Sequence, residues 1–231
     1  MASWAAALGV AGGLLMAAPL AAQERAVGLQ PYLMDEAREV ALARSAAPPA
    51  VGAGAAVYVL GAEGYRLAVP GENGFACLVQ RSFGVPTTSP AEFAEPRMLA
   101  PICHSPDAAA TVMQRDLFIA PLVSRGQTLA QVRAAEAGAY ESGRLTYPES
   151  AVVAYMLSTG QWLGDTVAAW RPHVMIWAPG LSKDDLMPAA LAGFGVGSGL
   201  PLIDARYGPR QVLLAIPLAR DVAVPPAVKT P

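Results

Sequence analysis

Three alternating side chains in one short segment carry the most suggestive chemistry of this 231-residue chain. His173, Met175 and Trp177 would share one face if their segment forms a strand, because alternate strand residues point the same way. This assumes that Val174 and Ile176 face the core; the structural alternative is a half-buried sheet face that a loop covers, with the histidine bonded to backbone. An imidazole, a thioether and an indole together suit a small ligand or an exported protein partner. We therefore predict that these three residues form the binding surface.

Two alternative hypotheses use the same histidine. Imidazole and thioether ligands suit Cu(I), so His173 and Met175 are candidate copper ligands, with Met156 or another residue needed to complete the site. Alternatively, His173 is the general base of a hydrolase whose nucleophile is Cys77 or Ser158. The chain has no Gly-x-Ser-x-Gly and no His-Glu-x-x-His motif. We therefore expect a non-catalytic protein with no cofactor, and keep copper binding and hydrolysis as alternatives.

Residues 1–22 decide how the cysteines are interpreted. They carry no charged side chain, and their apolar run ends in the small residues Ala21 and Ala22. This pattern is typical of a signal peptide that is cleaved near Ala22. Because no lysine or arginine precedes the run, an uncleaved anchor and a buried helix are the alternatives. With a signal peptide or an anchor, the body of the chain is expected outside the cytosol, in the periplasm or secreted; only a buried, cytosolic segment would place it elsewhere.

Export favours a disulfide between the two cysteines, Cys77 and Cys103. The bond would close a loop of about 25 residues and stabilise the fold by about 3 kcal/mol in the chain-entropy model. It would join a strand that carries Cys77 to a proline-rich loop, residues 82–107, that carries Cys103. His104 is expected to be an exposed residue of that loop. The remaining alternative is a pair of inert thiols.

The first strands are expected close together in the sequence. Apolar and β-branched runs between turn residues predict strands at 55–60, 65–69 and 75–81. Asn73 and Gly74 both tolerate positive φ and are typical of a hairpin. We therefore expect these three strands to form an antiparallel meander.

The rest of the chain predicts helices followed by more strands. Apolar spacing and the capping box at Thr128 predict helices at 34–45, 109–125 and 128–142, and later apolar runs predict strands at 151–157, 173–177 and 211–218. Because strands and helices do not alternate steadily, we expect an α+β fold. It would be a single domain, residues 34–218, on an antiparallel or mixed sheet of about six strands with three to four helices.

The flanking segments are expected to lie outside this domain. Residues 23–33 are predicted to be a linker, and residues 219–231 a disordered tail. The glycine-rich residues 193–199 do not match a dinucleotide-binding fingerprint in spacing and are expected to form a mobile loop.

Charge and hydropathy exclude two classes of partner. The 16 basic and 18 acidic residues are interspersed and leave a net charge of −2. Because the basic residues form no patch, we expect no nucleic-acid partner. No second long apolar run follows residue 22, so no membrane span is expected in the mature, soluble chain.

Three segments also support a resemblance. Taken together, Asn73-Gly-Phe-Ala-Cys77, Tyr155-Met-Leu-Ser158 and Pro172-His-Val-Met175 resemble segments of a group of uncharacterised exported bacterial proteins. The similarity extends over most of the predicted domain. It implies export, and it implies no particular activity because none is established for that group.

Overall fold

The structure, a computed structural model, describes residues 28–164, 172–182, 185, 202–204, 206–207 and 211–218. The predicted signal peptide, the glycine-rich segment and the C-terminal tail lie outside the described residues. Within this part of the chain, no helix has the length and apolar character needed to cross a membrane.

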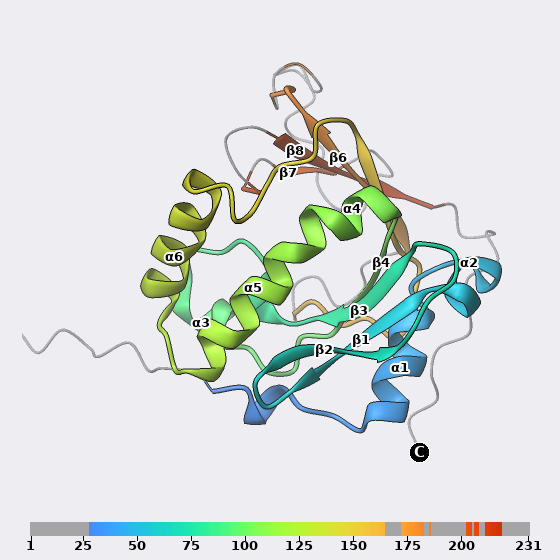
Figure 1. Cartoon of the computed structure of the whole chain (residues 1–231), viewed down its shortest axis with the longest axis horizontal. Helices are drawn as coiled ribbons and strands as arrows, with labels where there is room; N and C mark the ends of the chain where they lie inside the picture. The colour runs from blue at the N-terminus through green and yellow to red at the C-terminus, as the bar shows by residue number, and fades with distance from the viewer. Residues whose placement is uncertain are drawn as a thin grey trace, which may run out of the picture.

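One eight-stranded sheet organises the described residues, in the order β2-β1-β3-β4-β5-β6-β8-β7 (Figure 1). β1 and β3 pair in parallel, and every other neighbouring pair is antiparallel. The predicted α+β class and mixed sheet are confirmed, with eight strands in place of about six. The strands are β1 (Ala56–Gly61), β2 (Gly64–Val69), β3 (Ala76–Gln80), β4 (Ala100–His104), β5 (Val152–Met156), β6 (His173–Pro179), β7 (Leu202–Asp204) and β8 (Gln211–Pro217).

Helices cover both faces of this sheet. α1 (Glu36–Arg44) packs on the face that carries Cys77, Val79 and Cys103, which we call the α1 face. α4 (Pro106–Ala110) and α5 (Val112–Ser124) pack on the opposite face, which carries Leu78, Ile102 and Met175 and which we call the α5 face (Figure 1). The other helices are α2 (Pro49–Gly54), α3 (Pro90–Phe93), α6 (Leu129–Glu141) and the 3-10 turns η1 (Gln30–Tyr32) and η2 (Ser82–Gly84).

Side-chain caps begin two of the predicted helices. The Asp35 side chain accepts a hydrogen bond from the Arg38 backbone N–H at 2.9 Å and starts α1. Thr128 and Gln131 form the predicted capping box at the start of α6. The capping box at Thr128 is a local signal that the sequence reveals, whereas the helix at 34–45 was predicted from its apolar spacing and not from the Asp35 cap.

The predicted three-stranded meander is wrong. β2 forms the expected hairpin with β1, but β3 lies on the other side of β1 and runs parallel to it. Residues 70–75 therefore cross over the start of β1, where the Ala56 N–H donates to the Phe75 carbonyl at 2.8 Å. A Cβ at Gly71 would lie 2.2 Å from the Ala56 nitrogen, so this crossing requires glycine. Gly74, at φ +78°, turns the chain into β3 rather than into a hairpin.

The expectation that residues 82–107 form a loop is also wrong. Residues 100–104 form β4, which pairs with β3 along its length. A strand was not predicted here because proline is rare inside sheets, and Pro101 lies within β4. It is tolerated because β5 pairs only with Cys103 and His104, beyond Pro101. His104 is consequently buried, with 1% of its surface exposed, and is not a loop residue.

The core begins earlier than predicted. Leu29 and Tyr32, both 3% exposed, lie in the predicted linker at 23–33 yet pack in one hydrophobic cluster with Phe83 and Ile119. The described part of that segment is thus part of the domain.

Candidate functional site

A cavity of about 590 Å³ lies on the α5 face, where β3 and β5 end and β6 begins. Its apolar walls are formed by Val85, Pro86, Ala91, Met98, Met156, Trp162, Leu163, Met175, Tyr207, Leu213 and Ala215. Its polar and charged lining consists of Gln80, Ser82, Thr87, Glu92, Glu95, Arg97, His173 and Arg206. An apolar body with a few polar groups is the composition typical of a small-molecule site.

Strand register explains how distant residues meet in this cavity. Met156 is directly opposite His173 in the β5–β6 pair, and Met175 is directly opposite Ala215 in the β6–β8 pair. Directly opposed side chains on one face have Cβ atoms about 4.5–5.5 Å apart, so these four residues form one continuous floor. The small Ala215 side chain leaves space above that floor.

Trp162 forms a wall that is fixed by backbone and side-chain contacts. Trp162 and Leu99 exchange backbone hydrogen bonds of 2.9 and 2.8 Å, which attach the chain after β5 to the chain before β4. The Arg97 guanidinium lies 4.5 Å from the centre of the Trp162 ring and also pairs with Glu95 at 2.8 Å. The Arg206 Nη1 donates to the Pro86 carbonyl at 3.0 Å. The cavity wall therefore combines an aromatic ring with balanced charges.

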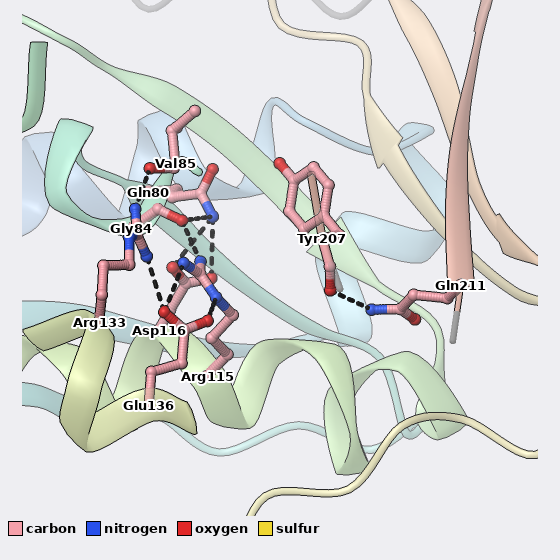
Figure 2. A network of polar contacts seen from close by, with 9 residues as sticks. All are labelled: Gln80, Gly84, Val85, Arg115, Asp116, Arg133, Glu136, Tyr207 and Gln211. Atoms are coloured by element: carbon pink, nitrogen blue, oxygen red, sulfur yellow. Dashed lines mark hydrogen bonds and ion pairs between the residues drawn. The ribbon is translucent and has the colours of Figure 1, made fainter. Parts of the chain in front are cut away.

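A buried polar network adjoins the cavity through Gln80 (Figure 2). The Gln80 Nε2 donates to both Asp116 carboxylate oxygens, at 3.0 Å each. Burial raises the pKa of the Asp116 carboxyl to about 6, although Arg115 and the Gln80 hydrogen bond oppose this shift. We therefore expect the Asp116 carboxyl, which adjoins the cavity through Gln80, to change its charge near pH 6.

Two arginines complete the network on the α6 side. Arg115 pairs with Glu136 and donates to the Gly84 carbonyl. Arg133 pairs with Glu136 at 2.7 Å and donates to the Val85 carbonyl at 3.0 Å. Burial opposes ionisation of Glu136, but the two arginines hold its pKa below the usual value. The network therefore fixes the 84–85 segment that forms one side of the cavity.

The three predicted binding residues do share one face, but it is the buried one. Met175 and Trp177 are 5% and 1% exposed, whereas Val174 and Ile176 are only partly buried and face the other side. The expectation that Val174 and Ile176 face the core is therefore wrong. His173 and Met175 line the cavity, while Trp177 lies deeper, with its ring centre 6.0 Å from that of His104.

The structure does not bring the predicted nucleophiles to His173. Cys77 lies on the α1 face, and its sulfur is 2.00 Å from that of Cys103, at disulfide distance. The Ser158 hydroxyl is buried against the Ser45 hydroxyl at 2.7 Å, beside the end of α1. His173 lies on the opposite, α5 face, so the hydrolase arrangement is not assembled.

The predicted copper ligands, His173 and Met175, lie in a cavity that further methionine side chains also line. Met156, which was expected to complete such a site, lines the cavity with His173 and Met175, and Met98 lines it as well. No cluster of three or more His, Cys, Asp or Glu residues suited to a metal occurs among the described residues. A metal here would therefore depend on thioether ligands.

Sequence reasoning missed Gln80, Asp116 and Trp162. The available signal was Gln80 itself, because it is a polar residue at a core-facing position of the predicted strand 75–81. Asp116 and Trp162 reach the site only through long-range packing. The chain matches no family model, no curated protein and no solved structure in the comparisons made. Fold and site together define an α+β protein with a ligand-sized cavity on its central sheet.

Proposed function

We propose that this protein is a non-catalytic binding protein whose cavity takes a small, mainly apolar ligand. The observation that carries the proposal is the cavity itself, whose volume of about 590 Å³ falls in the usual range for small-molecule sites. The floor of methionine and alanine side chains supplies adaptable apolar contact. His173 and Met175, predicted from the sequence as binding residues, both belong to this lining.

Binding of 2-naphthol and 2-methoxynaphthalene, followed by calorimetry, tests the proposal. We expect the wild-type protein to bind at least one of these two apolar probes in a one-to-one complex. Replacement Ala215→Phe would fill the cavity floor and should weaken binding about 10-fold or more.

Leu214→Phe is the matched control. Leu214 is adjacent in β8 but partly buried and directed to the other face, so affinity should change by less than about 2-fold. Thermal unfolding of both variants checks that each is folded. Binding of neither probe by the wild type, or undiminished binding by Ala215→Phe, would contradict a ligand site in this cavity.

Soft-cation binding is a second candidate, favoured by the four thioether and imidazole side chains in one cavity. Ag(I) is the appropriate probe because it has the ligand preference of Cu(I) and needs no reductant, which leaves the cysteine pair intact. We expect native mass spectrometry to show one Ag(I) per chain, lost in the Met156→Leu/Met175→Leu variant. Met113→Leu, a buried core methionine outside the cavity lining, should retain it. Equal Ag(I) retention in all three proteins would eliminate this candidate.

We place this binding outside the cytosol. Residues 1–22 have the composition of a signal peptide, and a cysteine pair at disulfide distance suits an oxidising compartment. The partner is accordingly an extracytoplasmic small molecule.

A further inference from the structure

The Gln80 amide has an orientation at the cavity that its neighbours fix. Its Nε2 faces three acceptors: both Asp116 oxygens at 3.0 Å and the Gly84 carbonyl at 3.5 Å. An ionised carboxylate and a carbonyl can only accept hydrogen bonds. Exchanging the amide oxygen and nitrogen would place three acceptors against a fourth, so the nitrogen must face Asp116.

The close contact between Asp116 and Gln80 depends on glycine at position 84. A Cβ at Gly84 would lie 2.3 Å from Asp116 Oδ1 and 2.9 Å from Gln80 Cγ. Glycine at this position therefore lets the carboxylate, the amide and the 84–85 backbone come into contact. Arg115, the nearest cation in the sequence, directs its donors to Glu136 and Gly84.

With its nitrogen committed, the amide presents its oxygen on the opposite side. Figure 2 shows the Gln80 nitrogen directed toward Asp116 and the oxygen directed away from that carboxylate. Gln80 belongs to the cavity lining, next to a floor built mainly of methionine and alanine side chains. A fixed acceptor in an apolar site selects strongly, because a ligand without a donor leaves it unpaired.

We infer that Gln80 is a specificity-determining acceptor and that the ligand carries an O–H or N–H donor on its apolar body. Asp116 is the positioning residue, since it acts on the ligand only by holding the amide. The inference rests on the proposed ligand-binding function and narrows the ligand to a class: small apolar alcohols, phenols or amides.

The same two probes separate the inference from the function on which it rests. 2-Naphthol and 2-methoxynaphthalene share one ring system and differ in the O–H donor. A wholly apolar cavity would favour the methyl ether, whereas we expect the wild type to prefer 2-naphthol. In Gln80→Met, of similar length and without an acceptor oxygen, the ratio of the two affinities should shift about 10-fold toward the ether.

Gln114→Met is the matched control. Gln114 is partly buried on α5, hydrogen-bonded to the Ala109 carbonyl and not part of the cavity lining, so the wild-type ratio should persist. If both probes bind but the Gln80→Met ratio equals that of the wild type, the inference fails and the binding function stands. If neither probe binds, the proposed function itself fails.

Asp116→Asn tests the positioning role with Gln80 retained. The introduced carboxamide offers both a donor and an acceptor, so the Gln80 amide could turn and the preference for 2-naphthol should fall about 5-fold. A merely structural role would weaken both probes equally and leave their ratio unchanged, and that result would contradict the positioning role.

The ratio of the affinities for 2-naphthol and 2-methoxynaphthalene should also depend on pH. Burial raises the pKa of Asp116 to about 6, so the carboxyl is ionised at pH 8 and largely protonated at pH 5. A protonated Asp116 can donate to the amide oxygen, so the preference for 2-naphthol should decline from pH 8 to pH 5. Among the described residues, the charged or titratable groups that act on Asp116 or its hydrogen-bonding partners are Arg115, Arg133, Glu136, Tyr65, Tyr140 and Tyr207. Gln80→Met retains these groups and His173, so a ratio that falls equally in that variant would contradict the role of Asp116.

Discussion

At the residue scale, His104 is the most unusual side chain of the core. Neither of its ring nitrogens has a hydrogen-bond partner in the described part of the chain. Burial alone lowers the pKa of this imidazole to about 3, against an ordinary value of 6.5. The folded state therefore holds His104 neutral at pH values where the unfolded chain would protonate it.

This difference predicts how stability changes with acid. The unfolded chain binds the extra proton below pH 6.5, so the stability that neutral His104 permits is complete above 6.5 and is lost from pH 6.5 toward 3. The loss is about 1.4 kcal/mol for each pH unit in that window. We expect His104→Leu to be increasingly more stable than the wild type as the pH falls from 7 to 4, as measured by urea unfolding.

Asp116 titrates in both proteins, so its contribution cancels in the difference between them. Its raised pKa has the opposite sign: it favours the folded state below pH 3.8 and loses that effect as the pH rises through about 6. Parallel stability curves for the wild type and His104→Leu would contradict this prediction, because they would mean that His104 binds a proton equally in the folded and unfolded states.

At the element scale, the cysteine pair joins two adjacent strands. Cys77 and Cys103 are directly opposite each other in the β3–β4 pair, and α1 covers them. Their separation of 26 residues encloses η2 and α3, which contribute Ser82, Ala91 and Glu92 to the cavity lining. A covalent link here would therefore reduce the conformational entropy that the segment between the two cysteines, which forms one cavity wall, has in the unfolded chain.

Removing that link should lower stability. We expect Cys77→Ala/Cys103→Ala to unfold in guanidinium with a free energy lower by about 3 kcal/mol, mainly because the unfolded chain gains entropy. Wild-type protein treated with dithiothreitol is the control, since reduction removes the link without removing side-chain atoms. We expect the intact mass of unreduced protein from the cell envelope to equal that of residues 23–231, which would show that residues 1–22 are removed. It should also be lower by the mass of two hydrogens, because the two cysteines are oxidised. A mass that includes both thiol hydrogens would contradict the proposed oxidised pair.

At the scale of the whole molecule, local signals were predictable and pairing partners were not. The helices at Asp35 and Thr128 and most strands have short-range signatures in capping and alternation. The crossing of residues 70–75 over β1 has none, because Asn73-Gly74 serves both a hairpin and a redirected chain. β4 was missed because Pro101 is tolerated only by virtue of where β5 stops pairing.

The candidate site was half predictable for the same reason. The alternation of residues 173–177 correctly grouped His173 with Met175. It could not tell which face is buried, because Val174 and Ile176 are at least as apolar as Met175 and Trp177. Gln80, Asp116 and Trp162 reach the cavity from distant elements, and no short-range pattern connects them.

The wide spacing of the cavity walls along the chain has a thermodynamic consequence. Lining residues come from β3, from the segment after β5, and from β6 and β8. The cavity therefore exists only when the strands from β3 to β8 are assembled in the sheet. A ligand that binds only this state shifts the folding equilibrium by mass action, in proportion to the logarithm of its concentration above the dissociation constant. Ligand binding and folding of the sheet are therefore coupled, and the increase in unfolding free energy on adding a ligand measures its binding.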